Sequence, residues 1–180
     1  AGQSTGPVCQ TGCARFGGVS ANMPKHEEQR VLRHSPQQMF DIVADVERYP
    51  EFLPWCLGTR ITKRDGDTLD ADMLIGFRMF RERFGSHVEL DRANSEINVR
   101  YTHGPFRYLV NCWRFTPHAE GCEIDFSVDF EFRSRLLQKI MGSLFTEAVH
   151  RMVRAFDARA GEIYGPAAAA PQDEPTVPAE

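Results

Sequence analysis

Long apolar runs are missing from this 180-residue sequence. No stretch approaches the ~18 apolar residues that a membrane-spanning helix needs, so any contact with a membrane is expected to be peripheral. An excess of positive charge is also missing, because 21 Lys and Arg residues stand against 25 Asp and Glu residues and give a net charge of −4. This balance argues against a general nucleic-acid-binding protein.

Metal-ligand and catalytic motifs are equally scarce. The six histidines form no HxH or HExxH spacing, and no nucleophile motif accompanies them. The five cysteines are odd in number and irregular in spacing, which predicts reduced thiols in a cytosol-like compartment. We therefore expect no catalytic residues, no metal site and no cofactor.

The apolar content is sufficient for one core, since 42% of the residues are hydrophobic and 13 of them are Phe. Residues 1–22 are rich in Gly, Ser and Thr, and we interpret them as a disordered N-terminal extension or an expression remnant ahead of Met23. Residues 166–180 are rich in Ala and Pro, which predicts a disordered tail. The expected folded domain spans residues 23–165.

Apolar periodicity and turn residues divide this region into elements. They predict strands at 28–34, 57–64, 69–77, 80–90, 97–101, 106–115 and 122–132. Ser35, followed by Pro36 and Gln38, predicts the capped start of a short helix. Apolar residues at three-and-four spacing predict a long helix over 135–164, which Gly165 ends.

These elements predict an α+β fold. Each strand offers one apolar face, and an antiparallel sheet of such strands needs a cover. The long amphipathic helix is the largest available cover. We therefore expect a curved antiparallel sheet wrapped around the C-terminal helix, with an apolar cavity between them where the curl is deep.

Residues 49–56, Tyr-Pro-Glu-Phe-Leu-Pro-Trp-Cys, are the most informative segment. Pro50 and Pro54 restrict the residues before them, which predicts a stiff, non-helical segment. A surface loop is normally polar, whereas this one is rich in aromatic residues. It is expected to pack on the core, line a pocket or meet a membrane.

This segment, reached through the residues Phe-Asp-Ile-Val-Ala-Asp-Val at 40–46, resembles the coenzyme Q-binding protein family of the START-like, polyketide cyclase superfamily. The same family group includes the ribosome-association toxin RatA, and both share the YP-FLPWC pattern. The resemblance covers about residues 25–165. It implies the helix-grip fold and a START-like ligand-binding domain at 23–165.

The resemblance implies a non-enzymatic ubiquinone carrier or chaperone that supports respiratory electron transport. Such a protein would be cytoplasmic and peripheral on the inner membrane, or on the mitochondrial matrix face in a eukaryote. The first alternative is a RatA-like toxin that binds the large ribosomal subunit and blocks subunit association, for which Arg78, Arg81 and Arg83 offer a basic face. The second is a cyclase- or hydratase-like enzyme in the same cavity.

A quinone with a polyprenyl tail needs an apolar tunnel with few polar groups. The inward strand faces, the last helix and the aromatic segment supply the candidates, with Tyr49 and Trp55 as possible hydrogen-bond donors to a carbonyl. The same residues are consistent with a solid core. The predicted ligand-binding residues are Tyr49, Phe52, Leu53, Trp55, Met73, Ile75, Phe77, Phe84, Trp113, Phe126, Val128, Phe130, Phe145, Val149 and Met152.

The strand at 106–115 has no consistent inward phase. Phe106, Tyr108 and Val110 share one face, whereas Leu109 and Trp113 share the other together with Phe115. A β-bulge would bring the aromatic residues of both sets to one side.

Overall fold

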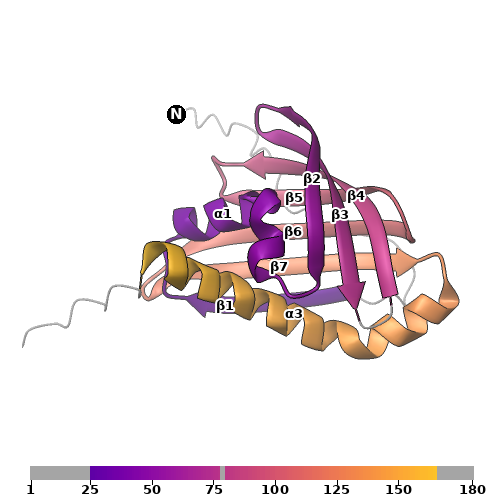
Figure 1. Cartoon of the computed structure of the whole chain (residues 1–180). Helices are drawn as coiled ribbons and strands as arrows, with labels where there is room; N and C mark the ends of the chain where they lie inside the picture. The colour runs from indigo at the N-terminus through magenta and orange to yellow at the C-terminus, as the bar shows by residue number, and fades with distance from the viewer. Residues whose placement is uncertain (1–24, 78–79, 166–180) are drawn as a thin grey trace, which may run out of the picture.

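The computed structural model describes residues 25–77 and 80–165, and the side chains of 25, 77–80 and 140–146 lie outside that description (Figure 1). Strands and helices follow the predicted order. The elements are β1 (Lys25–Leu32), α1 (Pro36–Ala44), the 3-10 helix η1 (Val46–Arg48), α2 (Tyr49–Phe52), β2 (Cys56–Asp65), β3 (Thr68–Phe77), β4 (Phe80–Asp91), β5 (Glu96–His103), β6 (Phe106–His118), β7 (Gly121–Phe132) and α3 (Arg135–Tyr164).

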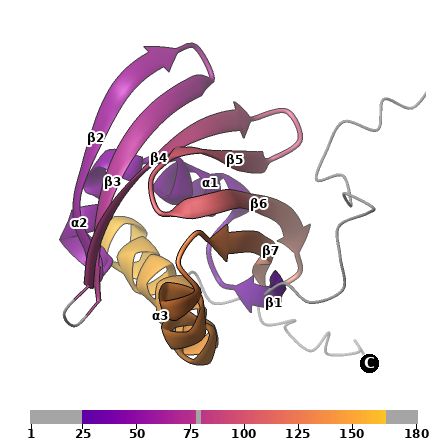
Figure 2. The ribbon, with the colours of Figure 1, turned by 90° about the vertical axis from the view of Figure 1, so that its right-hand side faces the viewer.

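The seven strands form one antiparallel sheet in the order β1-β7-β6-β5-β4-β3-β2. Figure 2 shows the sheet bending around α3, with α1 and α2 on the same concave side. The predicted α+β helix-grip architecture is therefore confirmed. Consecutive strands from β2 to β7 are neighbours, and β1 closes the other edge beside β7.

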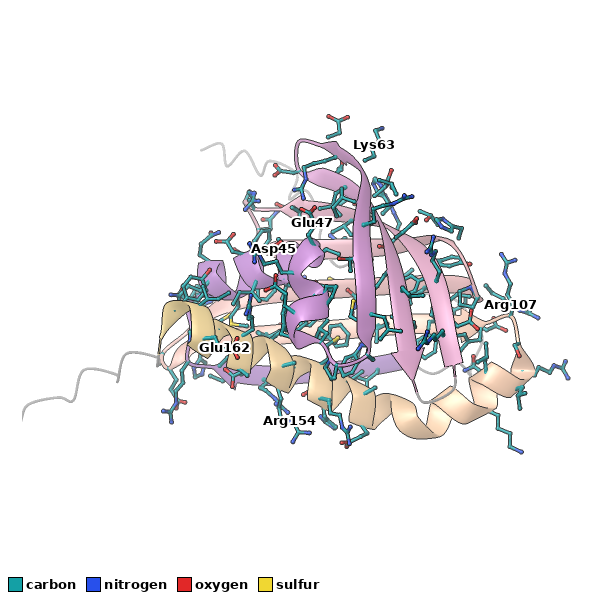
Figure 3. All side chains as sticks on the ribbon, viewed as in Figure 1. Asp45, Glu47, Lys63, Arg107, Arg154 and Glu162 are labelled. Carbon is teal, nitrogen blue, oxygen red and sulfur yellow. The ribbon has the colours of Figure 1, made fainter. Side chains whose placement is uncertain are left out.

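The strict alternation of buried and partly exposed residues in β7 shows why one face of the sheet packs on the core and the other faces solvent. Every second residue from Cys122 to Phe132 is buried, and the residues between them are partly exposed. Apolar side chains point to the concave side and acidic ones to the convex side, as the period of two requires. The charged side chains labelled in Figure 3 likewise project outward from the fold.

Helix α1 begins as predicted. Ser35 accepts a hydrogen bond from the backbone N–H of Gln38, and the Gln38 side chain accepts one from the Ser35 N–H, which completes a capping box. Pro36 occupies the first turn, where its missing N–H costs nothing. Met39 and Phe40 are among the most deeply buried residues and fix α1 against the sheet.

Helix α3 runs for 30 residues, about 45 Å at 1.5 Å per residue. Ser134 caps its start, and Gly165 follows its last residue with a φ of 82°. Its buried face includes Val149, Val153 and Phe156, and this face lies against α1, α2 and β7. No helix of the described part of the chain is long and apolar enough to cross a bilayer.

Polar contacts hold the second half of α3 in place. Arg159 forms an ion pair with Glu51 of α2 at 2.5 Å. On the other side, Nδ1 of His150 lies 3.4 Å from a carboxylate oxygen of Glu28 on β1. The helix is thus tied both to the aromatic segment and to the sheet edge.

The expectation of a wholly non-helical segment at 49–56 was wrong for its first half. Tyr49–Phe52 forms one turn of α-helix, because Pro50 lies in the first turn, where proline is tolerated. Leu53 then leaves the helix with extended backbone angles, as the following Pro54 requires.

The predicted extension at 1–22 and tail at 166–180 lie outside the described residues. Within the described part, Cys56 and Cys122 are free and buried. Cys112 is disulfide-bonded, so the expectation that all cysteines are reduced was wrong at this position.

Candidate functional site

A cavity of about 270 Å³ lies between the concave face of the sheet and α3. Its walls are almost entirely apolar, and they come from α1, η1, α2 and the residues that follow it, the five strands β3 to β7, and α3. Of the predicted ligand-binding residues, those that line it are Tyr49, Leu53, Trp55, Met73, Ile75, Phe84, Trp113, Phe126, Val128, Phe130, Val149 and Met152.

Three predicted residues do not contribute described side chains to the cavity. The side chains of Phe77 and Phe145 lie outside the described part of the structure. Phe52 is partly buried but is not a lining residue, because the turn of helix α2 directs it to Phe156 at 5.2 Å and beneath the Arg159 guanidinium. That contact anchors the aromatic segment to α3.

The helical wall is built from one stripe of α3. Val149, Met152 and Phe156 follow at spacings of three and four residues and therefore share a face. Phe156 is the last of these residues along the chain, and it makes edge-to-face contacts with Tyr49 at 5.4 Å and with Trp113 at 5.4 Å. Such aromatic pairs stabilise the joint between the helix, the sheet and α2.

The Tyr49 hydroxyl is engaged by the protein itself. It donates to the backbone carbonyl of Val43 at 2.5 Å, near the end of α1. Burial raises the pKa of Tyr49 well above its usual range, and the nearby Cys56 and Asp45 raise it further. The ring lines the cavity, whereas the hydroxyl proton that we expected to serve a ligand carbonyl is already donated to Val43.

Trp55 lies at the end of the aromatic segment and is partly buried against the core. Its backbone carbonyl accepts the N–H of Gly76 at 2.8 Å, which fixes the segment to β3. Its side chain lines the cavity. A role for its indole N–H toward a ligand stays a prediction.

A β-bulge explains the ambiguous phase of β6. The register against β7 shifts between Phe106 and Tyr108, which moves Phe106 to the same side as Leu109 and Trp113. Trp113 is 4% exposed and contacts Phe126 at 4.4 Å between ring centroids. The bulge that the sequence required is therefore present.

Sequence reasoning missed several lining residues. Some lie on α1 and η1, which we treated only as core, and others lie on strands whose phase was not assigned. The missed residues are Val43, Val46, Gly76, Glu82, Ser86, Val88, Ile97, Val99, Phe106, Leu109, Asn111, Phe132, Leu137, Ala148 and Phe156. The period-two pattern would have found Val88 and Val99, which continue the faces of Phe84 and Ile97.

Polar side chains in this wall are few. Ser86 is 4% exposed and donates a long hydrogen bond of 3.4 Å to the carbonyl of Ala71. Glu82 lies at the start of β4 and is half-buried. Asn111 lies in the middle of β6 and is also half-buried.

No pair of acidic or basic side chains converges in the described cavity wall. Over residues 25–77 and 80–165, no group of three or more His, Cys, Asp and Glu residues is placed to hold a metal ion. Burial raises the pKa of the Cys56 thiol, which keeps it protonated at neutral pH. The arrangement is suited to enclosing an apolar molecule.

The sequence is similar to a known protein family and to several named proteins. The family model for polyketide cyclase / dehydrase and lipid transport matches residues 32–157. The ribosome association toxin RatA of Rickettsia prowazekii is 34% identical over 144 residues, which cover 78% of this chain and 99% of the toxin. The mitochondrial coenzyme Q-binding protein COQ10 homolog B of Xenopus laevis is 36% identical over 145 residues, which cover 78% of this chain and 59% of that protein.

Among solved structures, the Zhui aromatase/cyclase from Streptomyces sp. R1128 superposes with a TM-score of 0.71 over 78% of this chain and 95% of the enzyme. The sequence identity is 16%, so this likeness bears on the fold alone. Family model and sequence relatives agree over most of the described residues. The chain belongs to the polyketide cyclase / dehydrase and lipid transport family.

Proposed function

We propose that this protein is a non-enzymatic carrier or chaperone for ubiquinone or a similar polyprenyl quinone. The observation that carries the proposal is the almost wholly apolar cavity between the sheet and α3. The likeness to a coenzyme Q-binding protein supports the choice of ligand. Burial of the tail supplies the binding free energy, at roughly 0.8 kcal/mol per CH₂ group.

The cavity size suits only part of such a ligand. Its volume of about 270 Å³ lies just below the ~300–1,000 Å³ that is usual for small-molecule sites. A quinone ring and the beginning of its tail fit this space, and the remaining isoprene units extend out of it. A protruding tail is well suited to transient contact with a respiratory membrane during exchange.

The aromatic segment is the proposed gate. Trp55 and Leu53 line the cavity from a segment stiffened by Pro50 and Pro54. Movement of this segment together with α3, to which Phe52 attaches it, opens the space between sheet and helix. Exchange of ligand is then coupled to a local opening.

Mass spectrometry of an organic extract tests the proposal. The protein is purified from a quinone-producing host beside Ala148→Phe, which fills the cavity from α3, and Arg154→Phe, which changes the exposed face of the same helix. We expect quinone in the wild type and in Arg154→Phe and much less in Ala148→Phe. Extracts free of quinone from all three folded proteins would contradict the carrier function.

A second candidate function is supported by a separate surface. Of the three predicted arginines, Arg78 lies outside the described residues. Arg81 and Arg83 are exposed on the convex face of β4, and neither forms an ion pair within the described part of the chain. The RatA relative matches over nearly its whole length. An Arg81→Glu, Arg83→Glu double variant should abolish co-sedimentation with large ribosomal subunits if the protein acts as such a toxin, because rRNA attracts unpaired cations.

A cyclase- or hydratase-like activity is the third candidate, favoured only by the shared fold of the aromatase/cyclase. Glu82 is the carboxylate in the described cavity wall, and no described acid or base accompanies it there. General acid–base chemistry normally needs a positioned partner. We therefore propose that the protein is not an enzyme.

A further inference from the structure

Asn111 interrupts an apolar row in the cavity wall. The strand registers pair Val88 with Val99, Val99 with Asn111, and Asn111 with Val128. The four side chains therefore form one line across β4, β5, β6 and β7, and all four line the cavity. Three are valines, and the fourth carries an amide.

This amide is unusual where it lies. Asn is disfavoured inside strands, whereas Val is favoured, so a fourth valine would complete the row at no cost. The Asn111 side chain makes no hydrogen bond to any residue in the described part of the chain. Because Asn111 is half-buried and lines the cavity, its amide is open to that space and can bond to water or to a polar group of a ligand.

The other polar groups of the described wall are differently placed. The Tyr49 hydroxyl donates to Val43, and the Ser86 hydroxyl donates to Ala71. Glu82 lies at the beginning of β4, beside the β3–β4 connection and pairing with Ile75 at the end of β3. Among the described polar groups of the cavity wall, Asn111 is thus the one in the middle of the sheet whose amide N–H donors and carbonyl acceptor are both available to a ligand.

We propose that the Asn111 amide is the specificity-determining anchor for the polar head of the cavity's ligand. This inference rests on the proposed quinone-carrier function and deepens it. The Nδ2 atom donates to a ring carbonyl, and the Oδ1 atom accepts from a ring hydroxyl. The site therefore takes a neutral head in either the quinone or the quinol form, with the tail along the valine row.

The carboxamide also selects against charge. It does not titrate, and the surrounding valines offer no counter-ion, so an anionic or cationic head would be desolvated without compensation. A head lacking any hydrogen-bonding atom would leave the amide unsatisfied. Discrimination between polar and apolar heads should accordingly depend on Asn111, whereas general affinity should depend on the valines.

The two tryptophans of the chain, Trp55 and Trp113, both line the cavity, so their fluorescence reports its occupancy. Decylubiquinone is titrated by fluorescence quenching, and n-decylbenzene, which has the same tail and no polar atom, is titrated by displacing the quinone. The variants are Asn111→Leu, which is close in shape, and Val99→Ala as the matched control. Far-UV circular dichroism and thermal unfolding accompany both.

Asn111→Leu should weaken decylubiquinone binding about ten-fold because the hydrogen bonds to the polar head are lost, and it should leave n-decylbenzene binding unchanged or tighter. Val99→Ala should weaken both probes by similar factors. Equal quinone affinity in wild type and Asn111→Leu would overturn the anchor while leaving the carrier function standing. A wild type that binds neither probe would overturn the carrier function and the anchor together.

Discussion

Replacement of Tyr49 by Phe separates the structural role of this residue from a role in ligand binding. The Tyr49 hydroxyl donates to the Val43 carbonyl, which belongs to the last turn of α1. The last four carbonyls of a helix have no helical donor, and Asp45 N–H already serves Asp41. Tyr49 therefore caps the carboxyl end of α1 through its side chain.

The expected loss follows from this geometry. Tyr49→Phe keeps the ring and its contacts with Phe52 and Phe156, and removes only the hydroxyl. An acceptor left buried and unpaired costs about 1–3 kcal/mol. With a middle value of about 2 kcal/mol and ~2–4 °C per kcal/mol for a domain of this size, the melting temperature should fall by ~4–8 °C.

Urea and thermal unfolding measure this loss, and Tyr108→Phe provides the control. The Tyr108 hydroxyl donates to Asp129 at 2.9 Å on the outer face of the sheet, where water can replace it, so its removal should cost less than ~0.5 kcal/mol. Quinone affinity of Tyr49→Phe should remain within two-fold of wild type, because its proton is not offered to the ligand. A variant as stable as wild type would refute the capping argument, and a ten-fold loss of affinity would restore the ligand-donor role.

The pH dependence has a definite sign. Burial raises the pKa of Tyr49 above its usual value near 10, so the folded protein keeps a proton that the unfolded chain releases at about pH 10. The stabilisation is complete below pH 10 and is lost as the pH rises beyond it. The difference in unfolding free energy between wild type and Tyr49→Phe should therefore shrink above pH 10, and a constant difference would contradict this assignment.

Two further changes address the cavity walls. Trp55→Ala should speed loss of bound quinone or disturb its transfer to vesicles several-fold, with a melting temperature close to wild type because Trp55 is only partly buried; unchanged retention and transfer would remove the gate. Phe156→Ala should lower the unfolding free energy by about 3–5 kcal/mol in urea titrations, since this 1% exposed ring joins α3 to both Tyr49 and Trp113, and a loss below ~1 kcal/mol would contradict that role.

Elements with an uninterrupted pattern were predictable from the sequence. In β7 the apolar residues occupy every second position over twelve residues, and in α3 they keep helical spacing over thirty residues. The buried face and the length of both elements could therefore be predicted from the sequence. The predicted bounds of α3 are confirmed. The capping residue Ser35 acts within a few positions of itself, so the helix start that it makes could be predicted without tertiary contacts.

Elements with a local irregularity were harder to predict. The bulge near Phe106 reverses the inward phase within β6, and a period-two pattern cannot place it. Leu109 and Asn111 consequently escaped notice as lining residues. In the aromatic segment, one helical turn rotates Phe52 toward Phe156, and Pro50 permits that turn as readily as it permits extended backbone.

The alternation of β4 allows the two main functional hypotheses to be tested independently. Arg81 and Arg83 lie on the convex face, whereas Glu82 and Phe84, one residue away from each, line the cavity. Because successive side chains of a strand point to opposite faces, a charge reversal outside leaves the cavity wall in place. A ribosome-binding defect in the arginine variants with normal quinone affinity, or the reverse pattern in Asn111→Leu, would assign the activity to one face. A loss of both activities in both sets of variants would instead mean that quinone binding and ribosome binding depend on each other through the fold that the two faces share.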